Sequence, residues 1–394
     1  MNECKIYLKP KKEESLLRFH PWVFSGAIAS IEGKPAEGDT VEVFSAGNQF
    51  LGIGHYQIGS IVVRILSFTP VRIDTAFWID RINRALALRH SLGLDIRNDI
   101  YRLVHGEGDG LPGLIIDIYA HTAVIQAHSA GMHHARKDIT NALREVLGSR
   151  LHRVFYKSEG TLPYKADLDE ENEYLWGGER QEPAVATENG LSFHIDWLKG
   201  QKTGFFIDQR ENRSLLQQYA DGRAVLNMFC YTGSFSVYAL KGGASLVHSV
   251  DSSTKAIALT NENVSLNFPD DTRHQSFTED AFAFLENRNE RYDLIILDPP
   301  AFAKHKNVLR NALIGYRKLN ALAIKKIKPG GVIFTFSCSQ IVSKNDFRLA
   351  VFSAAAQSGR VVRILHQLTQ PADHPVNIYH PEGEYLKGLV LHVE

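Results

Sequence analysis

The sequence predicts an α/β protein in three parts: a small β-rich barrel or sandwich at residues 1–70, an α+β domain at 71–190, and a doubly wound sheet at 191–394. Three observations support this prediction. A chain of 394 residues is too long for one ordinary core. Short β-type runs separated by glycine turns fill the first part, and apolar strand patterns alternate with helical patterns in the third.

The composition limits the classes of function. Hydrophobic residues make up 44% and charged residues 22% of the chain, as in soluble globular proteins. The 44 basic and 44 acidic residues balance, so nucleic-acid binding has to come from local patches. No apolar run is long enough to span a membrane and the charged start lacks a signal peptide, so we expect a cytoplasmic protein. Three separated cysteines predict neither disulfides nor a zinc site, and no metal is expected.

The first part contains an aromatic segment between its β-type runs. The runs lie at residues 4–8, 40–44, 50–56 and 61–66. The segment RFHPWVFSGAI carries Arg18 and Trp22, with further basic residues nearby. A platform for RNA bases and phosphates is one interpretation. Packing of the aromatic side chains in a core is the other, and composition favours it.

The second part mixes helical and strand patterns. Helices are predicted at 74–92 and 131–147, with two strands around a glycine-rich turn between them and a further strand at 153–157. This order predicts a small domain with an antiparallel sheet.

The third part alternates regularly between strands and helices, which indicates a parallel sheet with helices on both faces. Strands are predicted at 224–229, 246–250, 294–297 and 332–336, and helices at 234–241, 254–267 and 309–327. Two last strands, at 361–367 and 388–393, have no clear helix between them and predict an antiparallel hairpin at the sheet edge.

Acidic residues follow successive strands of this sheet, where doubly wound sheets bind their ligands. Asp251 and Asp298 end strand segments, and Asp280 begins a helix, where it is also a natural N-cap. The turn around Thr232 and Gly233 lacks the G-x-G-x-x-G fingerprint, which makes a nicotinamide dehydrogenase the weakest alternative. A carboxylate can accept hydrogen bonds from the hydroxyl groups of a ribose. Because the sequence has no turn that would bind phosphates, the ligand is expected to be a nucleoside without phosphates, such as S-adenosylmethionine. The residues expected around this cofactor are Asn227, Phe229, Tyr231, Thr232, Gly233, Asp251, Ser252, Asp280 and Asp298.

The segment GQKTGFFIDQRENR, just before the sheet, concentrates polar residues around two phenylalanines. We expect it to form a lid over the cofactor, although a plain interdomain connection is the alternative. The residues expected to contribute are Lys202, Phe205, Asp208, Gln209 and Arg210.

Eight short motifs, which follow one another along the chain, together resemble those of a known protein family. They are HPWVFSGAI, GEGDGLPGLIID, KTGFFIDQRENR, FCYTGSFS, LDPPAFAKHK, FSCS, ADHP and PEGEYLKG. From about residue 5 to the C-terminus the chain resembles the bacterial 23S rRNA cytosine-5 methyltransferases of the large-subunit rRNA methyltransferase I type. The resemblance implies a PUA RNA-binding domain, an α+β middle domain and a Rossmann-like methyltransferase acting on 23S rRNA. Whether the protein forms a homodimer stays open.

The chemistry of cytosine C5 explains why a cysteine matters. This ring carbon attacks a methyl donor only after a thiolate has added to C6, which is nucleophilic catalysis. Cys338 follows the strand at 332–336, at the same edge as Asp298. A lone cysteine after an apolar strand is ordinarily a buried small residue. Asp298 and the family resemblance reverse that expectation, so Cys338 is the predicted nucleophile.

The loop after the fourth strand is expected to hold the base. Asp298 is placed to hydrogen-bond its N3 and amino edge, Pro299 and Pro300 to stiffen the loop, and Phe302 to stack on the ring. The loop has no second cysteine to help release the product, so the group that removes the C5 proton is not identified.

Other functions remain as alternatives. Methylation of an exocyclic amine uses a D-P-P-aromatic loop without a nucleophile, but here Phe302 lies one position late and Cys338 is present. A uracil-5 methyltransferase also uses D-P-P and a cysteine. A non-catalytic RNA-binding scaffold is disfavoured because the aspartate series and Cys338 are all retained. Cys4 and Cys230 are predicted to be structural.

Overall fold

A computed structural model describes residues 4–163, 168, 171–178, 184–289, 291–303 and 305–394. The chain divides into two compact units, each described here by itself. Unit 1 comprises Met1–Ala186, Ile195–Ile207 and Ala372–Gly383, and unit 2 comprises Thr187–His194, Asp208–Pro371 and Glu384–Glu394. No helix in the described part of the chain is long and apolar enough to cross a membrane.

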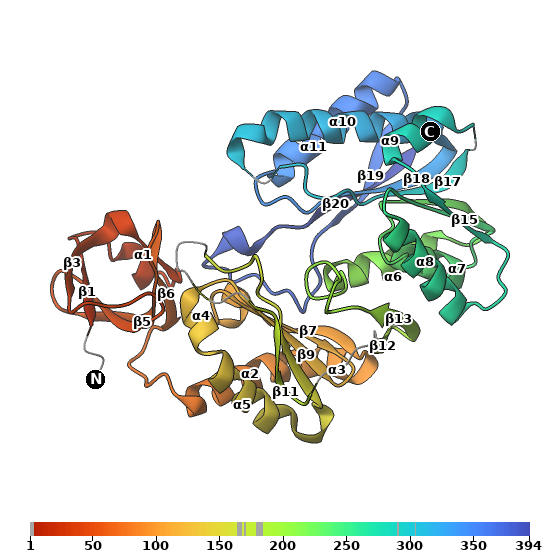
Figure 1. Cartoon of the computed structure of the whole chain (residues 1–394). Coiled ribbons are helices and arrows are strands. Elements are labelled where there is room, and N and C mark those ends of the chain that lie inside the picture. The colour runs from red at the N-terminus through yellow and green to blue at the C-terminus, as the bar shows by residue number, and fades with distance from the viewer. Residues whose placement is uncertain (1–3, 164–167, 169–170, 179–183, 290, 304) are drawn as a thin grey trace. The chain divides into compact units, whose positions relative to one another are not determined.

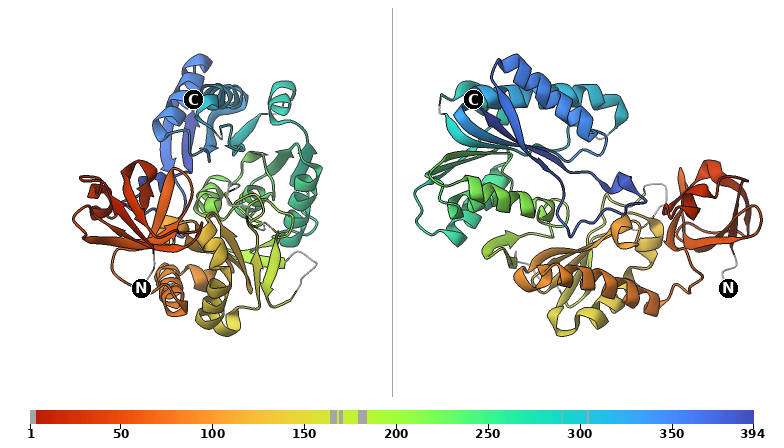
Figure 2. Two further views of the ribbon diagram at one scale, coloured as in Figure 1. Left: turned by 60° about the vertical axis from the view of Figure 1, so that its left-hand side comes forward. Right: turned by 180° about the vertical axis from the view of Figure 1, so that it is seen from behind.

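Unit 1 begins with a curled six-stranded sheet, visible in Figure 1 and from two further sides in Figure 2. Its order is β2-β6-β5-β4-β1-β3. The strands are β1 (Lys5–Leu8), β2 (Trp22–Phe24), β3 (Ile28–Glu32), β4 (Thr40–Phe44), β5 (Phe50–Tyr56) and β6 (Ile61–Ser67), with short helical turns α1 (Glu14–Leu17) and η1 (Ser25–Ala27). The four predicted runs are confirmed. Alternating buried residues such as Ile6, Leu8, Val41 and Val43 form its core.

The sequence-based prediction missed β2 and β3, which are the two edge strands of this sheet. Pro21 and Gly26 punctuate this segment, and they obscured a three-residue strand that pairs with β6. Short strands flanked by such residues are tolerated at an edge, where half of the backbone groups need no strand partner.

The second sheet of unit 1 has the order β11-β10-β9-β8-β7. Its elements are α2 (Thr75–Ser91), α3 (Leu94–Arg97), β7 (Ile100–His105), η2 (Gly106–Asp109), β8 (Leu114–Tyr119), β9 (Thr122–Ala127), α4 (Ala130–His134), α5 (Arg136–Leu147), η3 (Gly148–Arg150), β10 (Arg153–Tyr156) and β11 (Glu173–Trp176). Helices α2 and α5 share one apolar core with the sheet, and Figure 1 shows them side by side. Asp74 caps α2 by accepting from the Phe77 backbone N–H.

The predicted antiparallel middle sheet is confirmed for three of its strand pairs and is wrong for the fourth. Strand β10 runs parallel to β9, while the β7–β8, β8–β9 and β10–β11 pairs are antiparallel. Helices α4 and α5 connect β9 to β10, and a helical crossover of this kind is what a parallel pair requires. The single helix predicted at 131–147 is divided in two at Ala135. A two-stranded sheet follows, formed by β12 (Ala184–Glu188) and β13 (Leu191–Ile195).

Unit 2 is built on a seven-stranded sheet of order β16-β15-β14-β17-β18-β20-β19. The strands are β14 (Ala224–Met228), β15 (Leu246–Asp251), β16 (His274–Thr278), β17 (Tyr292–Leu297), β18 (Ile327–Ser337), β19 (Val362–Leu368) and β20 (Lys387–Val393). The first five are parallel: β14, β15, β17 and β18 match the four predicted strands, whereas β16 at the sheet edge was not predicted. Strands β19 and β20 form the predicted antiparallel hairpin, with β20 beside β18.

Helices cover both faces of this sheet, giving three layers (Figure 1). One face carries α6 (Arg210–Tyr219), α7 (Ser234–Lys241) and α8 (Thr254–Asn267), and the other carries α9 (Ala281–Asn287), α10 (Leu309–Lys326) and α11 (Lys344–Ser358). Short 3-10 turns occur at η5 (Ile207–Gln209), η6 (Lys306–Val308) and η7 (Pro381–Gly383). Central strands such as β17 are buried on both faces, which explains their continuous apolar sequence.

Candidate active site

The carboxyl ends of the parallel strands in unit 2 bring the predicted acidic residues and Cys338 to one edge of the sheet. Strand β14 pairs with β15 on one side and with β17 on the other, and β17 pairs with β18. Asp251 is the last residue of β15, Asp298 follows β17 directly, and Cys338 follows β18 directly. The strand order reverses at β14, and doubly wound sheets bind their ligands at such a reversal.

The turn between β14 and α7 has an unusual backbone. Phe229, Tyr231 and Gly233 adopt left-handed φ angles of 58°, 47° and 70°. At Gly233 a Cβ atom would lie 2.5 Å from a side-chain atom of Thr260, so only glycine fits. Thr260 and Asn263 of α8 hold the turn by donating to the carbonyls of Tyr231 and Thr232, at 3.0 and 2.8 Å. Strained backbone held in place by its neighbours is typical of ligand-binding turns.

Asp251 links this turn to the next one. One of its carboxylate oxygens accepts from the Tyr231 backbone N–H at 3.1 Å, and the other accepts from the Ser253 N–H at 2.9 Å. The carboxylate is half-buried and therefore keeps access to solvent beside a strained turn. A carboxylate next to a turn with no phosphate cradle fits a nucleoside with free ribose hydroxyls, and the residues present therefore fit S-adenosylmethionine.

The other predicted cofactor residues of this sheet have structural contacts. The side chain of Asp280 is exposed and caps α9 by accepting from the Ala283 N–H at 3.0 Å. Asn227 is buried in β14 and donates to Ser236 of α7 at 2.9 Å, while its carbonyl oxygen has no hydrogen-bond partner among the described residues. Ser252 is exposed in the turn after β15.

Part of the predicted lid segment lies beside the D-P-P loop within unit 2. The side-chain amide of Gln209 donates to Asp298 at 3.0 Å and accepts from Asn212 at 2.6 Å. Asp208 accepts from the Tyr385 hydroxyl at 2.7 Å. Arg210 is buried, with Nε 3.3 Å from the Glu211 carboxylate. The segment thus orients Asp298, a contact that sequence spacing alone does not reveal.

Cys338 is half-buried in a loop that is tied to the D-P-P loop. Ser339 donates from its hydroxyl to the Ala303 carbonyl at 2.7 Å, and Ser337 donates to the Tyr316 hydroxyl at 2.9 Å. Burial raises the pKa of Tyr316 to about 12, and negative charge on Cys338 or Asp298 acts in the same direction. Cys338 and Asp298 are therefore both close enough to the Tyr316 hydroxyl to affect its pKa.

Lys387 is a site residue that the sequence analysis missed. It is the first residue of β20, pairs in register with Ser337, and is only 6% exposed. Its ammonium group donates to the carbonyl of Ser339, so it lies against the segment that carries Cys338. Burial lowers the pKa of Lys387 to about 8, and a negative charge on Cys338 counteracts this shift. A lysine opening an apolar strand was the only signal in the sequence, since Ser339, whose carbonyl it contacts, lies 48 residues earlier.

The remaining residues of the D-P-P loop are packed to different degrees. Pro299 is buried and Pro300 is exposed. Phe302 is half-buried and packs against the Tyr316 ring, with centroids 4.7 Å apart. Cys230 is buried, and this burial raises its pKa to about 12, while its sulfur lies 3.4 Å from the Thr260 hydroxyl.

Four predicted site residues belong to unit 1. Phe205 is buried, and the Lys202 ammonium lies 4.4 Å from the centroid of the Phe206 ring. Arg18 is exposed and pairs with Glu14. Trp22 is half-buried and its indole N–H donates to Glu107 at 3.0 Å. Among the described aromatic side chains of unit 1, the most exposed are instead Phe19, Phe24 and Tyr379.

Comparison with known proteins identifies the family. Residues 154–382 match the S-adenosylmethionine-dependent methyltransferase family, and residues 6–68 match a PUA-like domain. "Ribosomal RNA large subunit methyltransferase I" of Aeromonas hydrophila is 41% identical over 396 residues, covering 98% of this chain and 99% of that protein. The protein of the same name from Shewanella amazonensis is 40% identical and covers 99% of both chains.

A solved structure agrees with this assignment. A protein assigned as a methyltransferase and complexed with SAH has a TM-score of 0.85 and 25% sequence identity, covering 99% of this chain and 100% of the other. The seven-stranded sheet and the N-terminal curled sheet are thus a methyltransferase fold and a PUA-like domain. The chain belongs to the ribosomal RNA large subunit methyltransferase I family of S-adenosylmethionine-dependent methyltransferases.

Proposed function

We propose that this protein methylates C5 of a cytosine in the 23S rRNA of the large ribosomal subunit, with Cys338 as a covalent nucleophile. The observation that carries the proposal is the position of Cys338 and Asp298 at the ends of adjacent parallel strands, with a buried lysine beside the cysteine. The relatives named above are rRNA large-subunit methyltransferases, which supports the class of substrate. Methylation of an exocyclic amine needs neither the cysteine nor the lysine.

In the proposed reaction the Cys338 thiolate bonds to C6 of the base, and the electrons of the C5–C6 double bond move toward C5. C5 would then attack the methyl group of bound S-adenosylmethionine, whose S–CH3 bond breaks to leave S-adenosylhomocysteine. Loss of the C5 proton to a base re-forms the double bond and expels the thiolate. Asp298 accepts from the exocyclic amino group of cytosine, whereas the same edge of uracil presents a carbonyl oxygen to it. This complementarity supports cytosine as the base.

Lys387 is proposed to favour the thiolate form of Cys338. A cation close to a thiol stabilises its charged form, and burial strengthens the attraction because water screens it less. The ammonium is charged below a pH of about 8, so its effect is present at neutral pH and is lost as pH rises through that value. The neighbouring charges of Lys344 and Glu384 form an ion pair of their own at 2.6 Å.

We expect Lys387→Met to move the pH midpoint of Cys338 alkylation by iodoacetamide upward by about one unit or more. Peptide mass spectrometry would follow the alkylation, with Cys4 in the same molecule as the internal reference. Methyl transfer at pH 7 should fall about tenfold or more, in line with the smaller thiolate fraction. Lys344→Met is the matched control and should change neither quantity. An unchanged Cys338 midpoint in Lys387→Met would refute the role of the lysine.

Asp251 is proposed to bind the cofactor ribose. We expect Asp251→Asn to weaken S-adenosylmethionine binding by about tenfold, because the amide removes a charged acceptor and disturbs the Tyr231 turn. Isothermal titration calorimetry would measure the affinity, and Asp221→Asn, on the surface of the same unit, is the control. Equal affinities of the Asp251 variant and wild type would exclude the ribose contact.

A further inference from the structure

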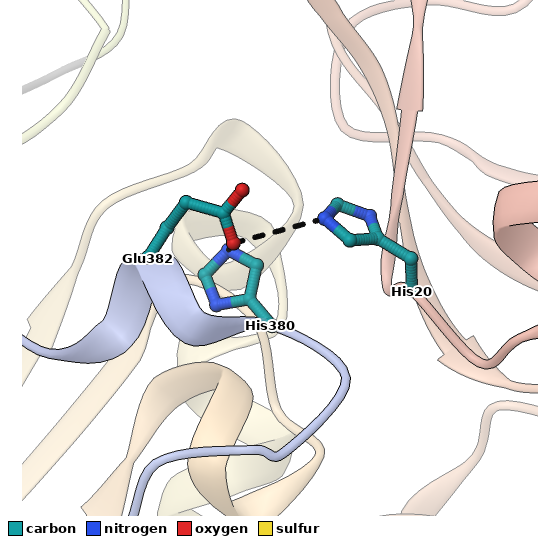
Figure 3. A group of neighbouring side chains, drawn as sticks. All are labelled: His20, His380 and Glu382. Atoms are coloured by element: carbon teal, nitrogen blue, oxygen red, sulfur yellow. Dashed lines mark ion pairs between the residues drawn. The ribbon is translucent and has the colours of Figure 1, made fainter.

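Three side chains from distant parts of the sequence meet in unit 1, as Figure 3 shows: His20, His380 and Glu382. His20 lies just before β2 of the PUA-like domain, Glu382 lies in η7, and His380 directly precedes η7. The Glu382 carboxylate oxygen is 3.9 Å from Nε2 of His20 and 3.8 Å from Nε2 of His380. One nitrogen or oxygen atom from each residue lies within 4.8 Å of the others.

His380 provides an independent observation. It is only 2% exposed, and neither of its ring nitrogens has a hydrogen-bond partner among the described residues. A buried polar group without a partner costs free energy, because it has given up its bonds to water. Its ring packs on Trp22, with centroids 4.2 Å apart, and Figure 3 shows one ring nitrogen at the Glu382 carboxylate. A ligand between the three side chains would satisfy this nitrogen.

The ligand set indicates which ion would bind. Imidazole nitrogens suit zinc and its transition-metal neighbours, and two histidines with one glutamate leave a coordination position open. In a tetrahedral site with bonds of about 2.0–2.1 Å the ligand atoms lie about 3.4 Å apart. The two observed spacings to Glu382 exceed this by about half an ångström, a change that rotation of its exposed side chain can provide.

We propose that His20, His380 and Glu382 form a binding site for a divalent transition-metal ion, zinc by its ligand chemistry. The bound ion joins the start of β2 to the segment Ala372–Gly383, which lie about 360 residues apart in the sequence but in the same unit. The site is independent of the methyl-transfer function proposed above, since its three residues are not among those proposed to carry out that reaction.

Binding has one structural consequence at His20. Its Nδ1 accepts from the Trp22 backbone N–H at 3.2 Å, so the neutral ring carries its proton on Nε2. When Nε2 of the neutral ring binds a metal ion, Nε2 gives up its proton and Nδ1 carries the ring's proton instead. A protonated Nδ1 cannot accept from the Trp22 N–H, so this amide has to change its hydrogen bond. A shift of the Trp22 amide resonance is therefore a local signature of binding.

The test uses the full-length chain, first stripped of metal with a chelator and then titrated with Co²⁺ followed by Zn²⁺. We expect visible d–d absorption from the Co²⁺ complex that Zn²⁺ abolishes, and a thermal unfolding temperature that Zn²⁺ raises. His380→Gln and Glu382→Gln should each lower the Zn²⁺ affinity by at least about tenfold. Glu382 is exposed, so its variant stays folded and remains informative even if the buried His380 variant does not.

His152→Gln is the matched control, because the rings of His121 and His152 stack at 4.2 Å and form the obvious competing pair of histidines. Zinc affinity should be unchanged in this variant. The proposal is overturned if Glu382→Gln binds Zn²⁺ as tightly as wild type, if affinity is lost in His152→Gln instead, or if the wild-type chain binds no Zn²⁺.

Discussion

Replacing Cys338 by alanine should reduce methyl transfer to 23S rRNA by a factor on the order of 10⁴ or more while S-adenosylmethionine still binds. The expectation follows from the chemistry of the base, because C5 of cytosine does not attack a methyl donor until a nucleophile has added to C6. Alanine is close to cysteine in volume, and Cys338 is only half-buried, so the fold should be retained. Mass spectrometry of nuclease-digested rRNA measures transfer, and calorimetry measures cofactor binding.

Cys4→Ala is the control for this variant, because Cys4 is also half-buried but packs against the core of the PUA-like domain. It should methylate RNA at the wild-type rate.

A second experiment tests the covalent bond directly, using RNA that carries 5-fluorocytidine. Fluorine at C5 cannot leave as a proton, so the enzyme should remain bound to the RNA in a denaturing gel, and Cys338→Ala should not. Full activity of Cys338→Ala would exclude the covalent mechanism, and an adduct with 5-fluorouridine RNA alone would change the assigned base to uracil.

Replacing Asp298 by asparagine should lower the rate of methyl transfer by about 10²- to 10³-fold with little change in cofactor affinity. Addition of the thiolate pushes electrons into the base, and a proton on N3 neutralises the resulting negative charge. The Asp298 carboxylate stabilises this protonated form by accepting from N3–H and the amino group, and a neutral amide does so much less. Asparagine keeps an oxygen that can accept from Gln209 Nε2, so the loop should hold its position. Single-turnover kinetics separates this loss in the chemical step from weaker RNA binding.

Asp293→Asn provides the matched control, since Asp293 lies near the opposite end of the same strand, β17. There it accepts from the Ala224 N–H and pairs with Lys328, both at 3.0 Å. Its loss should affect stability slightly and the rate of methyl transfer not at all. A wild-type single-turnover rate for Asp298→Asn would show that the carboxylate does not take part in the reaction.

Much of the site is predictable from local sequence. The strands β14, β15, β17 and β18 are short apolar runs, and the residue after a parallel strand necessarily lies at the ligand-binding edge of the sheet. This reasoning places Asp251, Asp298 and Cys338 at one edge without any coordinates. The N-cap role of Asp280 is equally local, because a carboxylate at a helix start accepts from a backbone N–H three residues later.

Residues that act through distant partners could not be predicted in this way. Lys387 becomes part of the site only because β20 inserts between β18 and β19 and brings the lysine into register with Ser337. Gln209 reaches Asp298 across 89 residues of sequence. The parallel pairing of β9 with β10 was missed for the same reason, since strand direction depends on how the connecting helices pack.

By itself, then, the sequence determined the alternation of strands and helices, the sheet edge at which the cofactor is proposed to bind, and the cysteine and aspartate proposed to act there. The tertiary structure decided which distant side chains join them: Lys387 beside Cys338, Gln209 beside Asp298, and His20 beside His380 and Glu382. The physical reason is that strand periodicity and helix caps depend on neighbouring residues, whereas these pairings depend on long-range packing of elements that local patterns do not encode.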